Sequence, residues 1–358
     1  MRRVARVETD SATRTNPSFA EPASVNVRHP SAVMKAVLPI SETVWPDHRR
    51  RKSRCSSAWK MRGRRAGASS VAIGRRYSFR MPERIRVACV QLTAGTNKAA
   101  NIEQAEGLVA RAAATGADLV VLPEKWNGVG GAEALAELAE PLEGGESVEA
   151  MAGWARTHGI SLVGGSITER REGHEKLSNT SVAFDPEGSL VAVYRKIHLF
   201  DVDVAGVRYR ESDAEEPGEE PVVATLEDWP VGLTVCYDLR FPELYRILAL
   251  EGAELVTIPA NFTERTGRDH WEVLVRARAI ENQCYVAAAG QVGEPMPGRP
   301  SYGRSLIVDP WGTVLAQAPD EQTVIVAELD RTRVRDVRAS LPSLANRRPE
   351  SYRWPAPA

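Results

Sequence analysis

Short apolar runs alternate with helical stretches from Ile85 onward. The runs at 85–92 and 118–124 are rich in β-branched residues, which predicts buried strands. Between them, residues 98–115 carry apolar side chains at helical spacing, and Asn97 is placed to cap that helix. Strand–helix alternation of this kind is typical of an α/β domain, here of about 275 residues.

The rest of the chain extends this alternation and adds a hairpin in the middle. Further runs that predict strands cover 160–170, 181–185, 189–199, 231–238, 254–262, 285–290, 305–312 and 323–330. Helical stretches cover 147–158, 242–253, 270–283 and 331–340. Pro186-Glu187-Gly188 is a turn signal between two of the strands. Hairpins mixed with helical crossovers predict sheets layered with helices.

The first 80 residues differ in charge from the rest. They hold 18 Lys/Arg and 5 Asp/Glu, a net charge of +13 with no apolar face, whereas residues 81–358 carry −14. We expect 1–80 to be a basic, disordered arm or a mistaken start upstream of Met81, and 81–358 to be the ordered domain with a C-terminal tail. Binding of nucleic acid by the arm is the less favoured alternative, because the acidic domain would repel phosphate.

The cysteines argue against a disulfide framework and against a zinc site. Cys55, Cys89, Cys236 and Cys284 form no CxxC pair and no Cys/His ladder, so a reducing cytoplasm is the expected compartment. No metal or other cofactor is expected. No window holds 18 consecutive apolar residues, which excludes a membrane span.

Polar residues stand at the ends of three predicted strands. Glu124 follows LVVLP, Lys196 lies in VYRKIHLFD, and Cys236 stands between GLTV and YDLRFPE. Ligands of open α/β sheets bind beyond such strand ends. A carboxylate can take the proton of a cysteine, and a lysine can stabilise an oxyanion, which together suit acyl transfer from a carbon–nitrogen bond.

Other interpretations of these residues remain open. Taken singly, each could be unremarkable: an exposed loop carboxylate, a solvated lysine and an inert core thiol. In a histidine-dependent cysteine hydrolase, His198 or His270 would be the base instead.

The motifs around the three residues resemble the nitrilase (carbon–nitrogen hydrolase) superfamily. They are LVVLPEKW, YRKIHLFDVDV, GLTVCYDLRFPELYR, ANFTERTGRDHWEVLVRARAIENQCYVAAAGQ, SYGRSLIVDPWGTVLA and LPSLANRRPESY. The resemblance runs from about Ile85 to Tyr352 and implies an α/β fold, a four-layer α-β-β-α sandwich with two mixed six-stranded sheets. It also implies a catalytic triad of Glu124, Lys196 and Cys236. A second family glutamate matches Glu211, in RESD.

The residues after the cysteine resemble the Nit branch of amidases. Members of that branch hydrolyse ω-amides of dicarboxylic acids or deaminated glutathione. Two further motifs, HWEVLVRARAIENQCYVAAA and SYGRSLIVDPWGTV, are closer to those of the deaminated-glutathione amidases. Arg240 could pair with a substrate carboxylate or serve as a structural partner of Asp238 or Glu243. The substrate-binding residues implied are Tyr237, whose N–H would assist Lys196, together with Arg240, Phe262 and Thr266, although Phe262 could equally be core packing.

The resulting prediction is a cytoplasmic, cofactor-free amidase that acts on a small carboxylate-bearing amide through a cysteine thioester. The alternative enzyme is an N-carbamoyl amino acid or ureidopropionate hydrolase on the same triad. A binding protein with an inactive site is disfavoured, because all three triad residues are present. The resemblance also implies a homodimer or larger homo-oligomer with the C-terminal segment near the interface.

Overall fold

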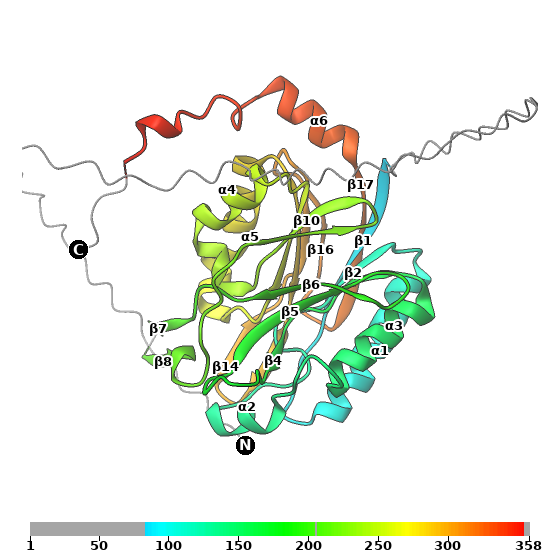
Figure 1. The fold of residues 1–358 in the computed structure, drawn as a ribbon, viewed down its shortest axis with the longest axis vertical. Coiled ribbons are helices and arrows are strands. Elements are labelled where there is room, and N and C mark those ends of the chain that lie inside the picture. The colour runs from blue at the N-terminus through cyan, green and yellow to red at the C-terminus, as the bar shows by residue number, and fades with distance from the viewer. Residues whose placement is uncertain (1–82, 205, 354–358) are drawn as a thin grey trace, which may run out of the picture. The chain divides into compact units, whose positions relative to one another are not determined.

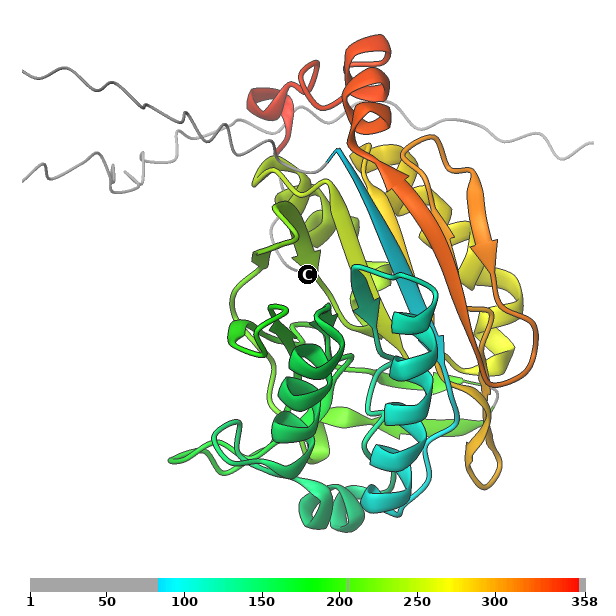
Figure 2. The same ribbon diagram turned by 90° about the vertical axis from the view of Figure 1, so that its right-hand side faces the viewer.

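The computed structural model describes residues 83–204 and 206–353, so the basic arm predicted over 1–80 lies outside the described residues. Within them, two large sheets pack face to face (Figures 1 and 2). The first sheet has the order β17 (Thr323–Asp330), β1 (Arg84–Gln91), β2 (Leu119–Val121), β3 (Ser161–Val163), β5 (Ser178–Phe184), β4 (Ile167–Glu169), with β6 (Leu190–Arg195) paired to β5. The second has the order β16 (Val314–Gln317), β15 (Leu306–Val308), β12 (Tyr285–Gly290), β11 (Leu255–Ala260), β10 (Trp229–Leu233), β9 (Val222–Leu226).

Helices cover the outer face of each sheet. On the first sheet lie α1 (Lys98–Ala114) and α3 (Glu146–His158), and on the second lie α4 (Pro242–Leu250) and α5 (Glu264–Asn282). The other described helices are α2 (Ala132–Leu138) and α6 (Arg331–Ser340), with 3-10 turns η1 (Glu211–Asp213), η2 (Cys236–Arg240) and η3 (Pro349–Ser351). Two hairpins, β7 (Asp201–Val204) with β8 (Val207–Arg210) and β13 (Val292–Met296) with β14 (Arg299–Tyr302), complete the fold.

This arrangement confirms the predicted four-layer sandwich but corrects its strand count. The first sheet has seven strands, because β6 pairs antiparallel with β5 from Thr180 opposite Arg195 onward. The expectation of two six-stranded sheets is therefore wrong for one of them. The added strand matters for function, since Lys196 directly follows it.

Burial on both faces explains the unbroken apolar runs. Along β1, Val87 and Cys89 face the second sheet, whereas Ala88 and Val90 pack under the helices. A strand buried on both sides needs apolar residues at every position. The same strand pairs with β17 along its full length, so the first and last strands of the sandwich are neighbours.

Several predicted strands end earlier than expected, and sharp turns interrupt two of them. The run at 160–170 is interrupted at Gly165, which has φ +61° and packs so closely on Pro123 that a Cβ atom would overlap its carbonyl. The run at 231–238 ends as strand β10 at Leu233, and a 3-10 turn begins at Cys236. The chain thus turns sharply at the cysteine instead of continuing through it.

Among the residues that the structure describes, no helix combines the length and the apolarity needed to cross a bilayer.

Two helical glycines give opposite predictions for the same substitution. A Cβ at Gly267 in α5 would overlap Tyr302 of β14, whereas nothing lies within 4 Å of a Cβ at Gly107 in α1. Gly267→Ala should lower the free energy of unfolding by about 1–3 kcal/mol through overpacking. Gly107→Ala should raise it by about 0.5–1 kcal/mol through helix propensity. Urea unfolding of both variants checks the pair, and equal shifts would contradict the described packing of α5 on β14.

Candidate active site

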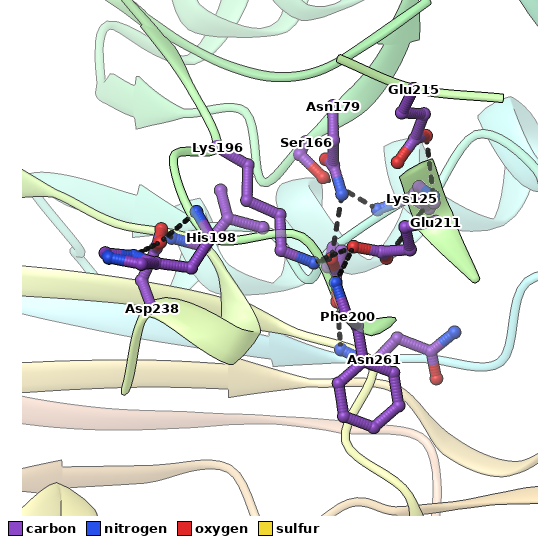
Figure 3. A network of polar contacts seen from close by, with 12 residues as sticks. Lys125, Ser166, Asn179, Lys196, His198, Phe200, Glu211, Glu215, Asp238 and Asn261 are labelled. Atoms are coloured by element: carbon purple, nitrogen blue, oxygen red, sulfur yellow. Dashed lines mark hydrogen bonds and ion pairs between the residues drawn. The ribbon is translucent and has the colours of Figure 1, made fainter. Parts of the chain in front are cut away.

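A buried lysine lies between two carboxylates in the candidate site. Lys196 is 1% exposed, and its Nζ donates to Glu124 Oε1 at 3.0 Å and to Glu211 Oε2 at 2.8 Å (Figure 3). Burial would lower the pKa of Lys196, but the two carboxylates outweigh it and hold that pKa well above its usual range. The lysine is therefore an ammonium at neutral pH.

Glu124 connects the two sheets. It follows β2 of the first sheet, and its Oε2 accepts a hydrogen bond at 2.8 Å from the backbone N–H of Asn261, which follows β11 of the second. Its Oε1 also accepts from Asn179 Nδ2 at 2.9 Å. Its carboxylate is thus fixed in one orientation, with donors from both halves of the sandwich.

Glu211 comes from the segment after the β7–β8 hairpin. Its Oε2 also accepts a hydrogen bond from the Phe200 N–H at 2.8 Å. Burial would raise the pKa of Glu211, but Lys196 and Lys125 outweigh it and lower that pKa to about 2. The carboxylate that orients Lys196 is therefore ionised over the whole physiological range.

Cys236 sits at the tip of the turn between β10 and η2. Its φ of +46° is in the left-handed region, which costs about 1–3 kcal/mol for a residue with a side chain. Burial first, and then the charge of Glu124, raise the pKa of the Cys236 thiol well above its usual range. The resting sulfur is thus a neutral thiol, and the carboxylate of Glu124, whose charge raises that pKa, is the neighbouring acceptor for its proton.

Asp238 fixes this turn and was not predicted as a site residue. Its buried carboxylate accepts from the Val235 N–H at 2.8 Å and from the Tyr194 hydroxyl at 2.7 Å. It also accepts from the His198 N–H at 3.1 Å and lies 2.7 Å from His198 Nδ1. Because Tyr194 and His198 flank Lys196 by two residues on either side, one carboxylate positions both the cysteine turn and the lysine segment.

The two histidines considered as alternative bases have other partners. The His198 ring contacts Asp238 and stacks on Phe241 at a centroid distance of 3.6 Å. The His270 Nδ1 lies 3.2 Å from Arg240 Nη1. The geometry therefore presents a carboxylate, and not an imidazole, to the thiol of Cys236.

A cavity of about 520 Å³ opens in front of these groups. Its lining includes all eight residues predicted from the sequence: Glu124, Lys196, Glu211, Cys236, Tyr237, Arg240, Phe262 and Thr266. Phe262 also packs on Trp271 at a centroid distance of 5.1 Å, so it serves both the wall and the core.

Arg240 lies on the wall without an acidic partner in the described part of the chain. Its guanidinium lies 5.1 Å from the centroid of Phe262 and 5.9 Å from that of Tyr237. No ion pair joins it to Asp238 or Glu243 among the described residues, and the oxygens of Asp238 are already occupied. The guanidinium is thus available to an anionic group in the cavity.

Four residues of the site were not predicted from the sequence: Lys125, Asn179, Glu215 and Asp238. Lys125 follows Glu124 directly, and Glu215 follows Glu211 by four residues, a spacing that brings side chains together on one side of a turn. These two spacings could have indicated that Lys125 and Glu215 belong to the site. For Asn179 and Asp238 the sequence offers none, because their roles depend on contacts across the fold.

Comparisons with known proteins agree with this geometry. The carbon–nitrogen hydrolase family model matches residues 86–339. Omega-amidase NIT2 of Danio rerio is 41% identical over 270 residues, covering 75% of this chain and 96% of that protein. The crystal structure of Saccharomyces cerevisiae Nit3, a member of branch 10 of the nitrilase superfamily, is similar with a TM-score of 0.67 and 34% identity, covering 73% of this chain and 96% of that one.

A second similar structure contains a modified cysteine. It is a mutant of the amidase from Nesterenkonia sp. AN1, which shows the result of Michael addition of acrylamide at the active-site cysteine. It has a TM-score of 0.61 and 31% identity, and covers 72% of this chain and 98% of that one.

The three described cysteines should differ in reactivity. Cys236 lines the cavity, whereas Cys89 and Cys284 are fully buried in the core, and burial raises the pKa of Cys284 to about 12. Iodoacetamide should therefore label Cys236 far faster than the other two, as read by peptide mass spectrometry. Cys89→Ala is the control and should leave that rate unchanged. Faster labelling of Cys284 would contradict the assignment of Cys236 as the reactive thiol.

Proposed function

The chain belongs to the carbon–nitrogen hydrolase family, and from this premise we propose that it hydrolyses a small carboxylate-bearing amide through a thioester on Cys236. The observation that carries the proposal is the neutral thiol of Cys236 beside Glu124, with the ammonium of Lys196 between Glu124 and Glu211. These are the proton acceptor, the nucleophile and the oxyanion donor that amide hydrolysis requires, and they line one cavity.

In the first half of the reaction, the Cys236 sulfur attacks the amide carbonyl carbon while its proton passes to Glu124. The negative charge that develops on the carbonyl oxygen is stabilised by the Lys196 ammonium and the Tyr237 N–H. Collapse of this intermediate breaks the carbon–nitrogen bond. The proton held by Glu124 goes to the leaving nitrogen, so ammonia or an amine departs and a thioester remains.

In the second half, water attacks the thioester. Glu124 takes a proton from that water, and the same two donors stabilise the second oxyanion. Breakage of the carbon–sulfur bond releases the carboxylic acid, and the proton on Glu124 returns to the sulfur. Every group is then in its starting state.

Arg240 supports a substrate that carries a carboxylate. It is four residues from the nucleophile, lines the cavity and has a guanidinium suited to bidentate pairing with a carboxylate. The curated relative reported above is an omega-amidase, which favours an ω-amide of a dicarboxylic acid. Two of the sequence motifs favour deaminated glutathione instead, and an N-carbamoyl amino acid stays the alternative on the same triad.

Ammonia or amine release from 2-oxoglutaramate, deaminated glutathione and N-carbamoyl-β-alanine tests this proposal on the full-length chain. We expect turnover of at least one of the first two. Cys236→Ala should abolish it, and Glu124→Gln should lower kcat by about 10² to 10⁴, the usual size of a lost general base. Arg240→Gln should raise KM for the carboxylate-bearing amide.

Cys89→Ala serves as the matched control, because it removes a buried thiol outside the cavity. Near-normal turnover by Glu124→Gln would refute the proposed base. Preference for the carbamoyl substrate would favour the alternative enzyme.

We also propose that the protein associates as at least a dimer. Apolar side chains are exposed on the outer helices, at Ile247 and Leu250 in α4 and at Val273 and Ile280 in α5. Val273 and Ile280 are seven residues apart and share one side of α5. Multi-angle light scattering of the wild type should give a dimer or larger, and Val273→Glu should weaken it, with the buried-core variant Cys89→Ala as control. A monomeric wild type at micromolar concentration would contradict this.

A further inference from the structure

We propose that Lys125 is a positioning residue of the active site, whose ammonium, held by Glu215, keeps Glu211 in place against Lys196. This inference rests on the function proposed above, in which Lys196 stabilises the oxyanion. It concerns a residue pair that the catalytic steps themselves do not use.

The contacts form a row of alternating charges. Lys125 Nζ lies 2.7 Å from Glu215 Oε1 and 3.8 Å from Glu211 Oε1, while the other oxygen of Glu211 lies 2.8 Å from Lys196 Nζ (Figure 3). Glu211 therefore lies between two ammonium groups, each facing a different carboxylate oxygen. A shift of Lys125 would change the position or the charge of the group that orients Lys196.

The backbone of Lys125 is strained and tightly held. Its φ is +49°, in the left-handed region that side chains disfavour. Its N–H donates to Ser166 Oγ at 3.1 Å, and its carbonyl accepts from Gln291 Nε2 at 3.2 Å. Strain that a surrounding structure maintains in this way is concentrated at functional sites. Here the strained backbone places the charged side chain of Lys125 beside the cavity.

The buried position of the Glu215 carboxylate is energetically unfavourable. Its side chain is 1% exposed, and within the described part of the chain neither of its oxygens has a hydrogen-bond donor of good geometry besides the ion pair with Lys125. Burial raises the pKa of Glu215, against the opposing effect of Lys125. An apolar pair of similar volume often stabilises a protein as well as a buried ion pair does. Stability alone therefore does not account for the pair.

The charge balance of the site explains the Lys125–Glu215 pair. Glu124 and Glu211 are two carboxylates around the single ammonium of Lys196, and the side chains of Glu124 and Lys196 are buried. Lys125 adds the second cation and is one of the two that lower the pKa of Glu211. Without Lys125 the pKa of Glu211 rises, so Glu211 becomes protonated at a higher pH and there no longer holds Lys196 by an ionic bond.

Two variants separate positioning from packing. Lys125→Met removes the cation, and Lys125→Met combined with Glu215→Leu replaces the ion pair by an apolar pair. In both we expect kcat to fall on the order of 10-fold, the size typical of substitutions that act through a neighbour. We also expect the acid limb of the kcat/KM profile to move to higher pH, because Glu211 then protonates more readily. Glu215→Gln, which keeps the cation, should cost less than Lys125→Met.

Lys98→Met is the matched control. Lys98 pairs with the buried Glu140 at 2.9 Å, and neither residue lines the cavity, so kcat and the pH profile should stay as in the wild type. If the apolar double variant does not fold, as judged by its melting temperature, Lys125→Gln with Glu215→Gln takes its place with the same expectations. A double variant with wild-type kcat and an unmoved acid limb would overturn the proposal. So would a Glu215→Gln loss as large as that of Lys125→Met.

A second readout needs no substrate. The rate at which iodoacetamide labels Cys236 at fixed pH should be lower in Lys125→Met than in the wild type, because Lys196, whose charge lowers the pKa of the Cys236 thiol, is then less firmly positioned. A wild-type chain that turns over none of the amides would remove the proposed function, and this comparison would still decide on Lys125. Equal labelling rates in the two proteins would then overturn the inference.

Discussion

The buried ammonium of Lys196 is the constraint on which the rest of the site depends. A charge with 1% exposure is tolerable only when carboxylates surround it, so Glu124 and Glu211 must both reach it. Glu124 comes from the first sheet and Glu211 from the segment after a hairpin, and a backbone N–H of the second sheet orients Glu124. The two sheets must therefore pack correctly for the carboxylates to reach Lys196, and the buried ammonium is tolerated only when they do.

Cys236 is positioned by a second buried carboxylate, that of Asp238. Asp238 accepts from the cysteine turn and from Tyr194 and His198, the residues on either side of Lys196. One carboxylate thus holds both the turn that carries the sulfur and the backbone segment that carries Lys196. Such preorganisation is the main way in which an enzyme stabilises developing charge.

Sequence patterns predicted the layers of sheet and helix, and the residues Glu124, Lys196 and Cys236, because both depend on local signals. Apolar runs mark buried strands, and a polar residue at a strand end stands out against them, as with Glu124 and Cys236. The patterns did not reveal where the chain bends, since the turn at Gly165 depends on contact with Pro123. Nor did they reveal Asp238, whose partners are brought together only by the packing of η2 against β6. Long-range contacts leave no periodic trace in a sequence.

The pairing of β1 with β17 has a consequence for how the protein is made. These strands pair from Arg84 opposite Asp330 to Gln91 opposite Thr323, so the first strand of the sandwich cannot complete its pairing until the last strand is available. Contacts of such long sequence separation slow folding. On the ribosome, strand β1 is exposed until residue 330 has left the exit tunnel, and its apolar edge is a template for wrong partners meanwhile. Completion of the sandwich, and with it catalytic competence, is accordingly a late event in biogenesis.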